Sequence, residues 1–255
     1  MRKVEGPSLP PPFAGSGRAP ERGRDPHHSQ ARGGSRQAGL ILLPARGLLF
    51  DNDGVLVDSE ASVETSWSRW AVDHDLDPAE VMAAVPGRRA ADTVGLFVGQ
   101  AEVAESTAMV TRYELEGAEA TSAVPGVLDL VSQLVGVPWA VVTSGVRVLA
   151  TARLRGAGID PPDVVVTAED VTAGKPDPQP YLTGAARLGL APADLLVLED
   201  SVSGVASGQA AGCQVVGIGP VALRTTADVV VRDLVGARWT GDGLLLPAAA
   251  LLRAP

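Results

Sequence analysis

The sequence predicts a doubly wound α/β fold, in which helices cover both faces of a parallel sheet and a small helical domain is inserted after the first strand. Three observations indicate this fold. Short, almost continuously apolar runs recur from Gly47 onward, and each is followed by polar or glycine-rich residues and then by a helix-like stretch. Buried parallel strands that alternate with helices have this pattern. Only residues 60–123 interrupt the alternation, because they contain no convincing strand.

Six of the apolar runs are expected to be strands of the sheet: 47–50, 138–143, 163–167, 195–200, 214–219 and 228–231. Helix-like stretches lie between several of them, at 127–135, 146–156 and 179–190, with glycine near several of their ends. In a Rossmann-like fold of this kind, ligands bind at the carboxyl ends of the strands. Candidate functional residues are therefore expected where these runs end.

The interruption at residues 60–123 is interpreted as a helical cap domain. Four stretches in it have helical character: 62–74, 78–85, 91–98 and 101–117. Trp67, Trp70 and Phe97 are expected to form the core of this cap rather than to contact a substrate. The α/β core then consists of residues 47–59 and 124–240, and residues 241–255 are expected to be a C-terminal tail.

Residues 1–46 differ from the rest of the chain in composition and charge. They carry a net charge of +5. Because the whole chain carries −9, residues 47–255 carry −14. A segment so rich in Gly, Pro and Ser buries too little apolar surface to offset the entropy lost on ordering, and we expect a disordered extension. A nucleic-acid-binding arm or a targeting peptide is the alternative. The acidic remainder argues against nucleic acid as a partner.

Composition narrows the classes of protein further. We expect no signal peptide at the N-terminus, and no apolar run approaches the roughly 18 residues of a transmembrane helix. A single cysteine, Cys213, excludes an internal disulfide framework, and three histidines, two of them adjacent near the N-terminus, disfavour zinc or triad chemistry. We expect a cytoplasmic monomer without a membrane partner.

The stretch "LLFDNDGVLVDSE", residues 48–60, places acids directly after the first apolar run. A calcium loop would put Asp51, Asp53 and Gly54 at its third, fifth and sixth positions and Glu60 at its twelfth. Its first ligand position, however, would be Leu49, and an apolar run rather than a helix precedes it. The calcium interpretation is therefore disfavoured.

A phosphoryl-transfer site needs a nucleophile, a proton shuttle, a divalent cation and donors for the transferring oxygens. Asp51 at a strand end can act as a carboxylate nucleophile. Asp53, two residues on, points the same way in an extended backbone and can act as acid and base. Gly54 permits a sharp turn there. An ordinary acidic turn remains the alternative until the other strand ends are considered.

Two further runs are followed by groups suited to phosphate. After the second run, Thr143 and Ser144 offer hydroxyls and Gly145 exposes backbone donors, which can form a phosphate cradle. Lys175 is one of only two lysines in the chain and follows the third run, where a compact positive charge can orient a carboxylate and a phosphate.

The fourth run ends in a pair of acids, Glu199 and Asp200. Together with Asp51 and Asp53 they would repel one another unless a cation lies among them. An all-oxygen set suits Mg²⁺, which binds one or two carboxylates, water and substrate phosphate.

Four segments, "FDNDGVLVDS", "VVTSG", "GKPDP" and "LEDS", resemble the four motifs of the haloacid dehalogenase superfamily in order and in spacing. The helical insertion resembles the small cap of its phosphoglucomutase-like subfamily. The resemblance implies that Asp51 is the nucleophile that becomes an aspartyl phosphate, and that Asp53 is the acid/base, with its carbonyl on the metal. It further implies that Thr143 binds the phosphoryl group.

The same resemblance implies that Lys175 stabilises the phosphoryl group, that Asp200 ligates Mg²⁺ and that Glu199 acts on the metal through water. Dehalogenases of the superfamily lack the second acid, so Asp53 favours phosphoryl chemistry. In "PGRRAADT", Arg89 fits the cap pattern of sugar- and polyol-phosphate phosphatases, and we expect it to bind substrate with Ser144 and Gly145.

The resulting hypothesis is a magnesium-dependent phosphatase of small phosphorylated sugars or polyols, such as glycerol 3-phosphate or 2-deoxyglucose 6-phosphate. Two alternatives stay open. A β-phosphoglucomutase-like phosphotransferase would release an isomer instead of free phosphate. A catalytically idle regulator would bind a sugar phosphate without converting it.

Overall fold

The computed structural model describes residues 39–254 of the chain. Residues 1–38 of the expected disordered extension lie outside the described residues. Within the described part, every helix falls short of the length and apolar character that crossing a bilayer requires.

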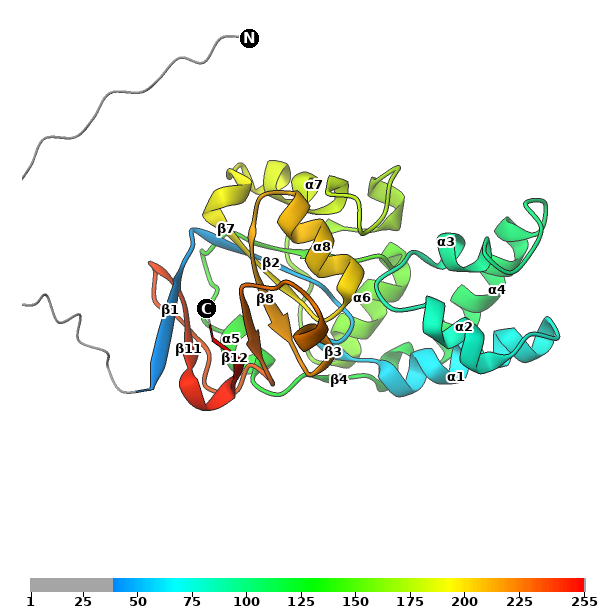
Figure 1. Ribbon diagram of the computed structural model, residues 1–255, viewed down its shortest axis with the longest axis horizontal. Helices are drawn as coiled ribbons and strands as arrows, with labels where there is room; N and C mark the ends of the chain where they lie inside the picture. Colours follow the sequence, from blue (N-terminus) through cyan, green and yellow to red (C-terminus); the bar gives the residue numbers. More distant parts are fainter. Residues whose placement is uncertain (1–38, 255) are drawn as a thin grey trace, which may run out of the picture. The chain divides into compact units, whose positions relative to one another are not determined.

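A seven-stranded sheet forms the centre of the fold (Figure 1). Its strands lie in the order β12-β9-β8-β7-β2-β5-β6, and all neighbours are parallel except β12 and β9. Their bounds are β2 Gly47–Phe50, β5 Trp139–Val142, β6 Val164–Val166, β7 Leu195–Glu199, β8 Gln214–Ile218, β9 Val229–Val231 and β12 Leu251–Arg253. Six of these are the strands predicted from the apolar runs, and the predicted α/β class with a mostly parallel sheet is confirmed.

Helices cover both faces of this sheet. In the inner strand β2, Leu48 and Phe50 belong to an apolar core shared with α5 and α6, whereas Leu49 belongs to a second core shared with α7 and α8. Alternate side chains of a strand point to opposite faces, so a strand buried on both faces is apolar throughout. The helix bounds are α5 Val127–Val131, α6 Arg147–Gly156, α7 Gln179–Leu188 and α8 Val202–Ala210.

Four further helices lie between β3 and β4 and are grouped together in Figure 1: α1 Glu60–Asp73, α2 Pro78–Ala84, α3 Ala90–Val94 and α4 Val103–Glu116. They pack around Trp67 and Trp70, with Phe97 partly buried against the same cluster. The chain enters and leaves this helical insertion through the antiparallel pair β3 (Val57–Asp58) and β4 (Ser122–Ala123). The prediction that these aromatic residues form a core of the insertion is confirmed.

A second sheet of three strands, in the order β1-β11-β10, corrects two of the predicted boundaries. β1 (Leu40–Pro44) pairs antiparallel with β11 (Gly243–Pro247), which also pairs with β10 (Arg238–Trp239). The assignment of residues 241–255 to a tail was therefore wrong, and so was that of residues 40–44 to a disordered extension. The physical reason is burial, since side chains of β1 and β11 join the core on the α5 and α6 face of the main sheet.

Short 3-10 helices occupy several connections. In the described part of the chain they are Ala118–Ala120, Ala168–Asp170, Pro192–Asp194, Val221–Arg224 and Ala248–Ala250. The second of these follows β6 and begins the loop that carries Lys175. The third leads into β7.

Leu244 in β11 gives a test of the second sheet. Its side chain is completely buried, so Leu244→Ala is expected to lower the free energy of unfolding by about 2–5 kcal/mol. Leu252 in β12 is 38% exposed, and Leu252→Ala is the matched control, with an expected loss below about 1 kcal/mol. Urea unfolding measures both changes. Small and equal losses at the two positions would contradict a structural role for β11.

Candidate active site

Asp51 directly follows the inner strand β2, and its side chain is almost completely buried. Lys175, in the loop between β6 and α7, donates from Nζ to Asp51 Oδ1 at 2.9 Å and to Glu199 Oε1 at 2.6 Å. It also donates to the carbonyl of Val142, at the end of β5, at 3.0 Å. An ammonium has three N–H donors. Lys175 therefore joins the carboxyl ends of three adjacent strands, β5, β2 and β7.

Glu199 ends β7 and is completely buried. Its Oε1 accepts from Lys175 and, at 2.7 Å, from the hydroxyl of Tyr181 on α7. Its Oε2 accepts from the backbone N–H of Ser201 at 3.1 Å and from the Ser201 hydroxyl at 3.0 Å. Both oxygens of Glu199 are thus used by protein donors. The residue fixes Lys175 and the start of α8.

Asp51, Glu199 and Asp200 form an acidic group in which one carboxylate oxygen of each lies within 4.8 Å of the others. The pKa of Asp51 is raised to about 7, first by burial and then by the charge of Glu199, although Lys175 lowers it. The pKa of Asp200 lies well above its usual value, again through burial and then through Glu199 and Asp51. Burial opposes the charge of Lys175, but Asp51 and Glu199 raise its pKa, so the ammonium stays charged.

The chemistry of the acidic group fits a magnesium ion. Its donors are all carboxylate oxygens, which Mg²⁺ prefers. One lysine does not neutralise three carboxylates, and a divalent cation beside them favours their ionised forms. Asp51 and Asp200 are the residues that could bind the ion directly, because both oxygens of Glu199 already accept protein hydrogen bonds.

Gly54 gives a test of this packing. It has a φ of +77°, and a Cβ added to it would overlap the carboxylate of Asp200. Gly54→Ala is expected to lower the free energy of unfolding by about 1–3 kcal/mol through backbone strain. It should also weaken Mg²⁺ binding, because Asp200 must move.

Gly136→Ala is the matched control for Gly54→Ala. Gly136 has a φ of +76°, and a Cβ there meets nothing within 4 Å, so this variant shares the strain without the overlap. Urea unfolding and Mg²⁺ titration of both variants separate the two effects. Equal Mg²⁺ affinity in the two variants would contradict the expected displacement of Asp200.

The carboxylate of Asp53 lies outside the acidic group, which corrects the expectation that four carboxylates converge. Its Oδ1 accepts from the Ser59 hydroxyl at 2.6 Å and from Arg153 Nη1 at 2.8 Å. Its Oδ2 accepts from the side-chain amide of Asn52 at 3.2 Å. The reason for the difference is a buried cation, Arg153, which sequence reasoning did not identify as a partner. The contribution of the Asp53 carbonyl to metal binding stays a prediction.

Thr143, Ser144 and Gly145 follow β5 at the same edge of the sheet as Asp51, since Phe50 lies opposite Val141 in the parallel register. The Gly145 N–H donates to Thr143 Oγ1 at 3.0 Å. The Ser144 hydroxyl donates to the carbonyl of Gly87 at 2.9 Å, so it ties the helical insertion to the core. The phosphate cradle assigned to these residues stays a prediction.

A pocket of about 200 Å³ lies between the helical insertion and the loop after β5. Its lining includes Thr107, Thr111 and Glu114, which are spaced along one face of α4. Thr107 Oγ1 is buried and has no hydrogen-bond partner within the described residues. Arg89 lines the pocket as well, but its guanidinium pairs with Asp92 at 2.7 Å and donates to a carbonyl of the loop before Lys175.

Comparison with known proteins agrees with this arrangement of strands and acids. Residues 45–212 match the model of the haloacid dehalogenase-like hydrolases, which is more than half of the chain. The chain belongs to this family. The family predicted from the four motifs is thereby confirmed.

Two curated relatives of this hydrolase are phosphatases by name. Hexitol phosphatase A of Escherichia coli (strain K12) is 47% identical over 180 residues, which cover 68% of this chain and 82% of that protein. Glycerol-1-phosphate phosphohydrolase 2 of Saccharomyces cerevisiae is 32% identical over 190 residues, covering 70% and 76%. The crystal structure of β-phosphoglucomutase from Clostridium difficile shares the fold, with a TM-score of 0.68 at 18% identity and coverage of 74% and 92%.

The hydrolase has residues at this site that sequence reasoning missed: Ser59, Glu114, Arg153, Tyr181 and Ser201. One of them left a signal in the sequence. Arg153 lies four residues after Leu149 and directly before Leu154, on the apolar side of a predicted helix, where an arginine needs a buried partner. Glu114 and Tyr181 depend on contacts between different elements, whereas Ser59 and Ser201 bind acids close to them in the sequence.

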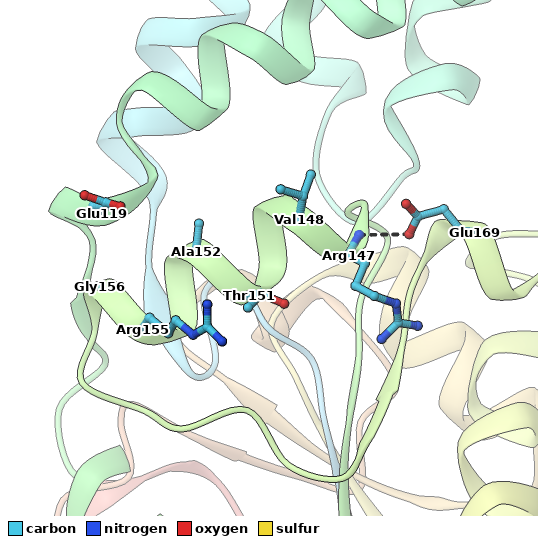
Figure 2. Close-up of a pocket in the computed structure, with 8 residues that line it drawn as sticks. All are labelled: Glu119, Arg147, Val148, Thr151, Ala152, Arg155, Gly156 and Glu169. Atoms are coloured by element: carbon cyan, nitrogen blue, oxygen red, sulfur yellow. Dashed lines mark hydrogen bonds between the residues drawn. The ribbon is translucent and has the colours of Figure 1, made fainter.

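A larger pocket of about 730 Å³ lies along α6 of the hydrolase (Figure 2). Figure 2 shows Arg147, Val148, Thr151 and Arg155 along this side of the helix, with the Arg147 N–H donating to Glu169 at 2.8 Å. None of the residues lining it belongs to the predicted site. The acids and the lysine described above therefore lie apart from its lining.

Proposed function

We propose that this hydrolase is a magnesium-dependent phosphatase of small sugar or polyol phosphate monoesters, and that it acts through an aspartyl phosphate on Asp51. One observation carries the proposal. A buried carboxylate at the end of the inner strand β2 contacts a buried lysine and lies beside a second acid that can bind the metal. Each of these groups is a component that phosphoryl transfer requires.

The geometry supports a separate role for each oxygen of Asp51. Lys175 occupies Oδ1, so Oδ2 is the oxygen that attacks the phosphorus atom. The bond from phosphorus to the substrate alcohol breaks, and Asp53 gives a proton to the departing oxygen. Asp53 then takes a proton from the water that cleaves the aspartyl phosphate, which yields inorganic phosphate and restores Asp51.

The other groups act on the phosphoryl oxygens. Lys175 carries a positive charge against them, and Thr143 offers its hydroxyl. Asp51 and Asp200 would hold Mg²⁺, which would supply additional positive charge to screen the phosphate from the carboxylate nucleophile. Burial of the site strengthens all of these electrostatic interactions.

The substrate class rests on the relatives and on the pocket. Relatives named for hexitol and glycerol phosphates point to a polyol, and the hydroxyls and carboxylate on α4 can form hydrogen bonds with polyol hydroxyls. The proposed partner is accordingly a small phosphorylated metabolite. That the enzyme acts as a cytoplasmic monomer stays a prediction.

The test is phosphate release from a panel of hexitol, glycerol, aldose and nucleoside monophosphates, with Mg²⁺ or with EDTA. Release from the polyol and sugar phosphates that stops in EDTA is the expected result. An isomeric sugar phosphate without free phosphate would support the β-phosphoglucomutase-like alternative instead. Binding of a sugar phosphate without any product would support the idle regulator.

A further inference from the structure

Arg153 is a charged side chain in the interior of the protein. It lies on α6, between the buried residues Ala150 and Leu154, and only 3% of its side chain is exposed. Arg153 is not among the residues of α6 that line the larger pocket. Burying a guanidinium is costly unless it is paired, and its partners therefore indicate its role.

The partners of Arg153 are two carboxylates from different parts of the chain. Nη1 donates to Asp53 Oδ1 at 2.8 Å, and Nη2 donates to Glu114 Oε1 at 3.2 Å. Nε is buried and has no partner among the described residues. Asp53 belongs to the loop after β2, whereas Glu114 belongs to α4 of the helical insertion and lines the small pocket. One guanidinium thus connects the pocket with the loop of Asp53.

The hydrogen bonds to Asp53 are unequal at its two oxygens. Oδ1 accepts two short bonds, from Ser59 and Arg153, while Oδ2 accepts one longer bond from Asn52. Two donors on one oxygen fix the orientation of the carboxylate. They leave Oδ2 as the oxygen with the greater capacity to exchange a proton.

We propose that Arg153 is a positioning residue that holds Asp53 Oδ1, so that Asp53 Oδ2 can pass a proton to the leaving alcohol, with Glu114 linking Arg153 to the substrate pocket. The proposal rests on the proposed function, which makes Asp53 the acid/base. An arginine that only joined the insertion to the core would stabilise the fold without a selective effect on proton transfer. The two roles predict different results with different leaving groups.

The experiment compares kcat/KM for a polyol phosphate and for p-nitrophenyl phosphate, whose phenolate leaves without needing a proton. The ratio kcat/KM covers the steps up to release of the first product, the alcohol. It therefore includes the step in which Asp53 acts as an acid and excludes the later step in which Asp53 acts as a base. Arg153→Met is expected to lower the value for the polyol phosphate about 10- to 100-fold, as for other residues that orient a catalytic group. The value for p-nitrophenyl phosphate should fall less than about threefold, since general acid catalysis is not required there.

Three controls keep the test decisive. Arg153→Lys retains a positive charge and a hydrogen-bond donor, so it should be more active on the polyol phosphate than Arg153→Met. It replaces Arg153→Met in the comparison if that variant does not fold. Arg155 is an exposed arginine on the same helix, and Arg155→Met should leave kcat/KM unchanged for both substrates. In an Asp53→Asn background, Arg153→Met should cause no further loss, because the two residues act in one chain of contacts.

Equal losses on both substrates, or a further loss in the Asp53→Asn background, would show a structural role and overturn the proposal. Unchanged activity of Arg153→Met on the polyol phosphate would overturn it as well. Failure of the proposed function is distinguishable, since the unmodified enzyme would then release no phosphate from either substrate.

Discussion

Asp51→Asn is expected to lower kcat for phosphate release by at least about 1,000-fold, because an amide cannot attack phosphorus and loss of a nucleophile removes the whole covalent route. The variant should still fold, since asparagine has the same shape and its Oδ1 can accept the hydrogen bond from Lys175. Phosphate release and a thermal melting curve measure the two properties. Asp160→Asn, at an exposed position, is the matched control and should retain full activity.

The pH dependence of stability gives a second test with Asp51→Asn, this time of the raised pKa of Asp51. The pKa of Asp51 is raised to about 7 in the folded protein, from a usual value of 3.8, first by burial. The folded state therefore binds the proton more tightly, and with Mg²⁺ removed the ionised carboxylate lowers stability as the pH rises from about 4 to 7. Asp51→Asn lacks this loss. Its free energy of unfolding relative to the unmodified protein should rise over that window and then stay level.

Retained phosphatase activity in Asp51→Asn would contradict the role of Asp51 as nucleophile. A stability difference that does not change between pH 4 and 7 in EDTA would contradict the raised pKa. The two outcomes are independent, because the first concerns the reaction and the second concerns only the buried charge.

Lys175→Met is expected to lower the free energy of unfolding by about 3–5 kcal/mol, the cost typical of removing one partner of a buried ion pair. The side chain of Lys175 is 1% exposed and contacts Asp51 and Glu199, which would both lose their cation. Phosphate release should be lost in addition. Urea unfolding in EDTA measures the stability without a contribution from metal.

Two controls accompany Lys175→Met. Arg46→Met removes a cation whose ion pair with Asp194 is exposed, and it should cost less than about 1 kcal/mol. The double variant Lys175→Met/Glu199→Gln removes one uncompensated charge, so it should regain part of the stability while remaining inactive. A single variant as stable as the unmodified protein would contradict the importance of this buried contact.

Local patterns were sufficient to predict the strands of the main sheet except β12. Strands such as β2 and β7 are buried on both faces, and they appear in the sequence as unbroken apolar runs. β1 and β11 escaped prediction because β1 is partly exposed and pairs with a segment about two hundred positions away. No local pattern reports such a pairing.

The same distinction holds at the candidate site. Asp51, Lys175, Glu199 and Asp200 were predicted to gather because parallel strands end at one edge, and the structure brings them together. The carboxylate of Asp53 was expected beside them, yet it turns to Arg153, one hundred residues further along the chain. That contact depends on how α6 packs against the loop after β2, which periodicity does not determine.

The pairing of β1 with β11 has a consequence for synthesis of the chain on the ribosome. β1 is made first among the described strands, but its partner is made nearly last. Until residues 243–247 emerge, the backbone of β1 presents unpaired donors and acceptors, together with a leucine that is later buried. Unpaired edges of this kind are prone to associate with other chains. The nascent protein should therefore be most vulnerable to aggregation, and most dependent on chaperones, just before its final strands are translated.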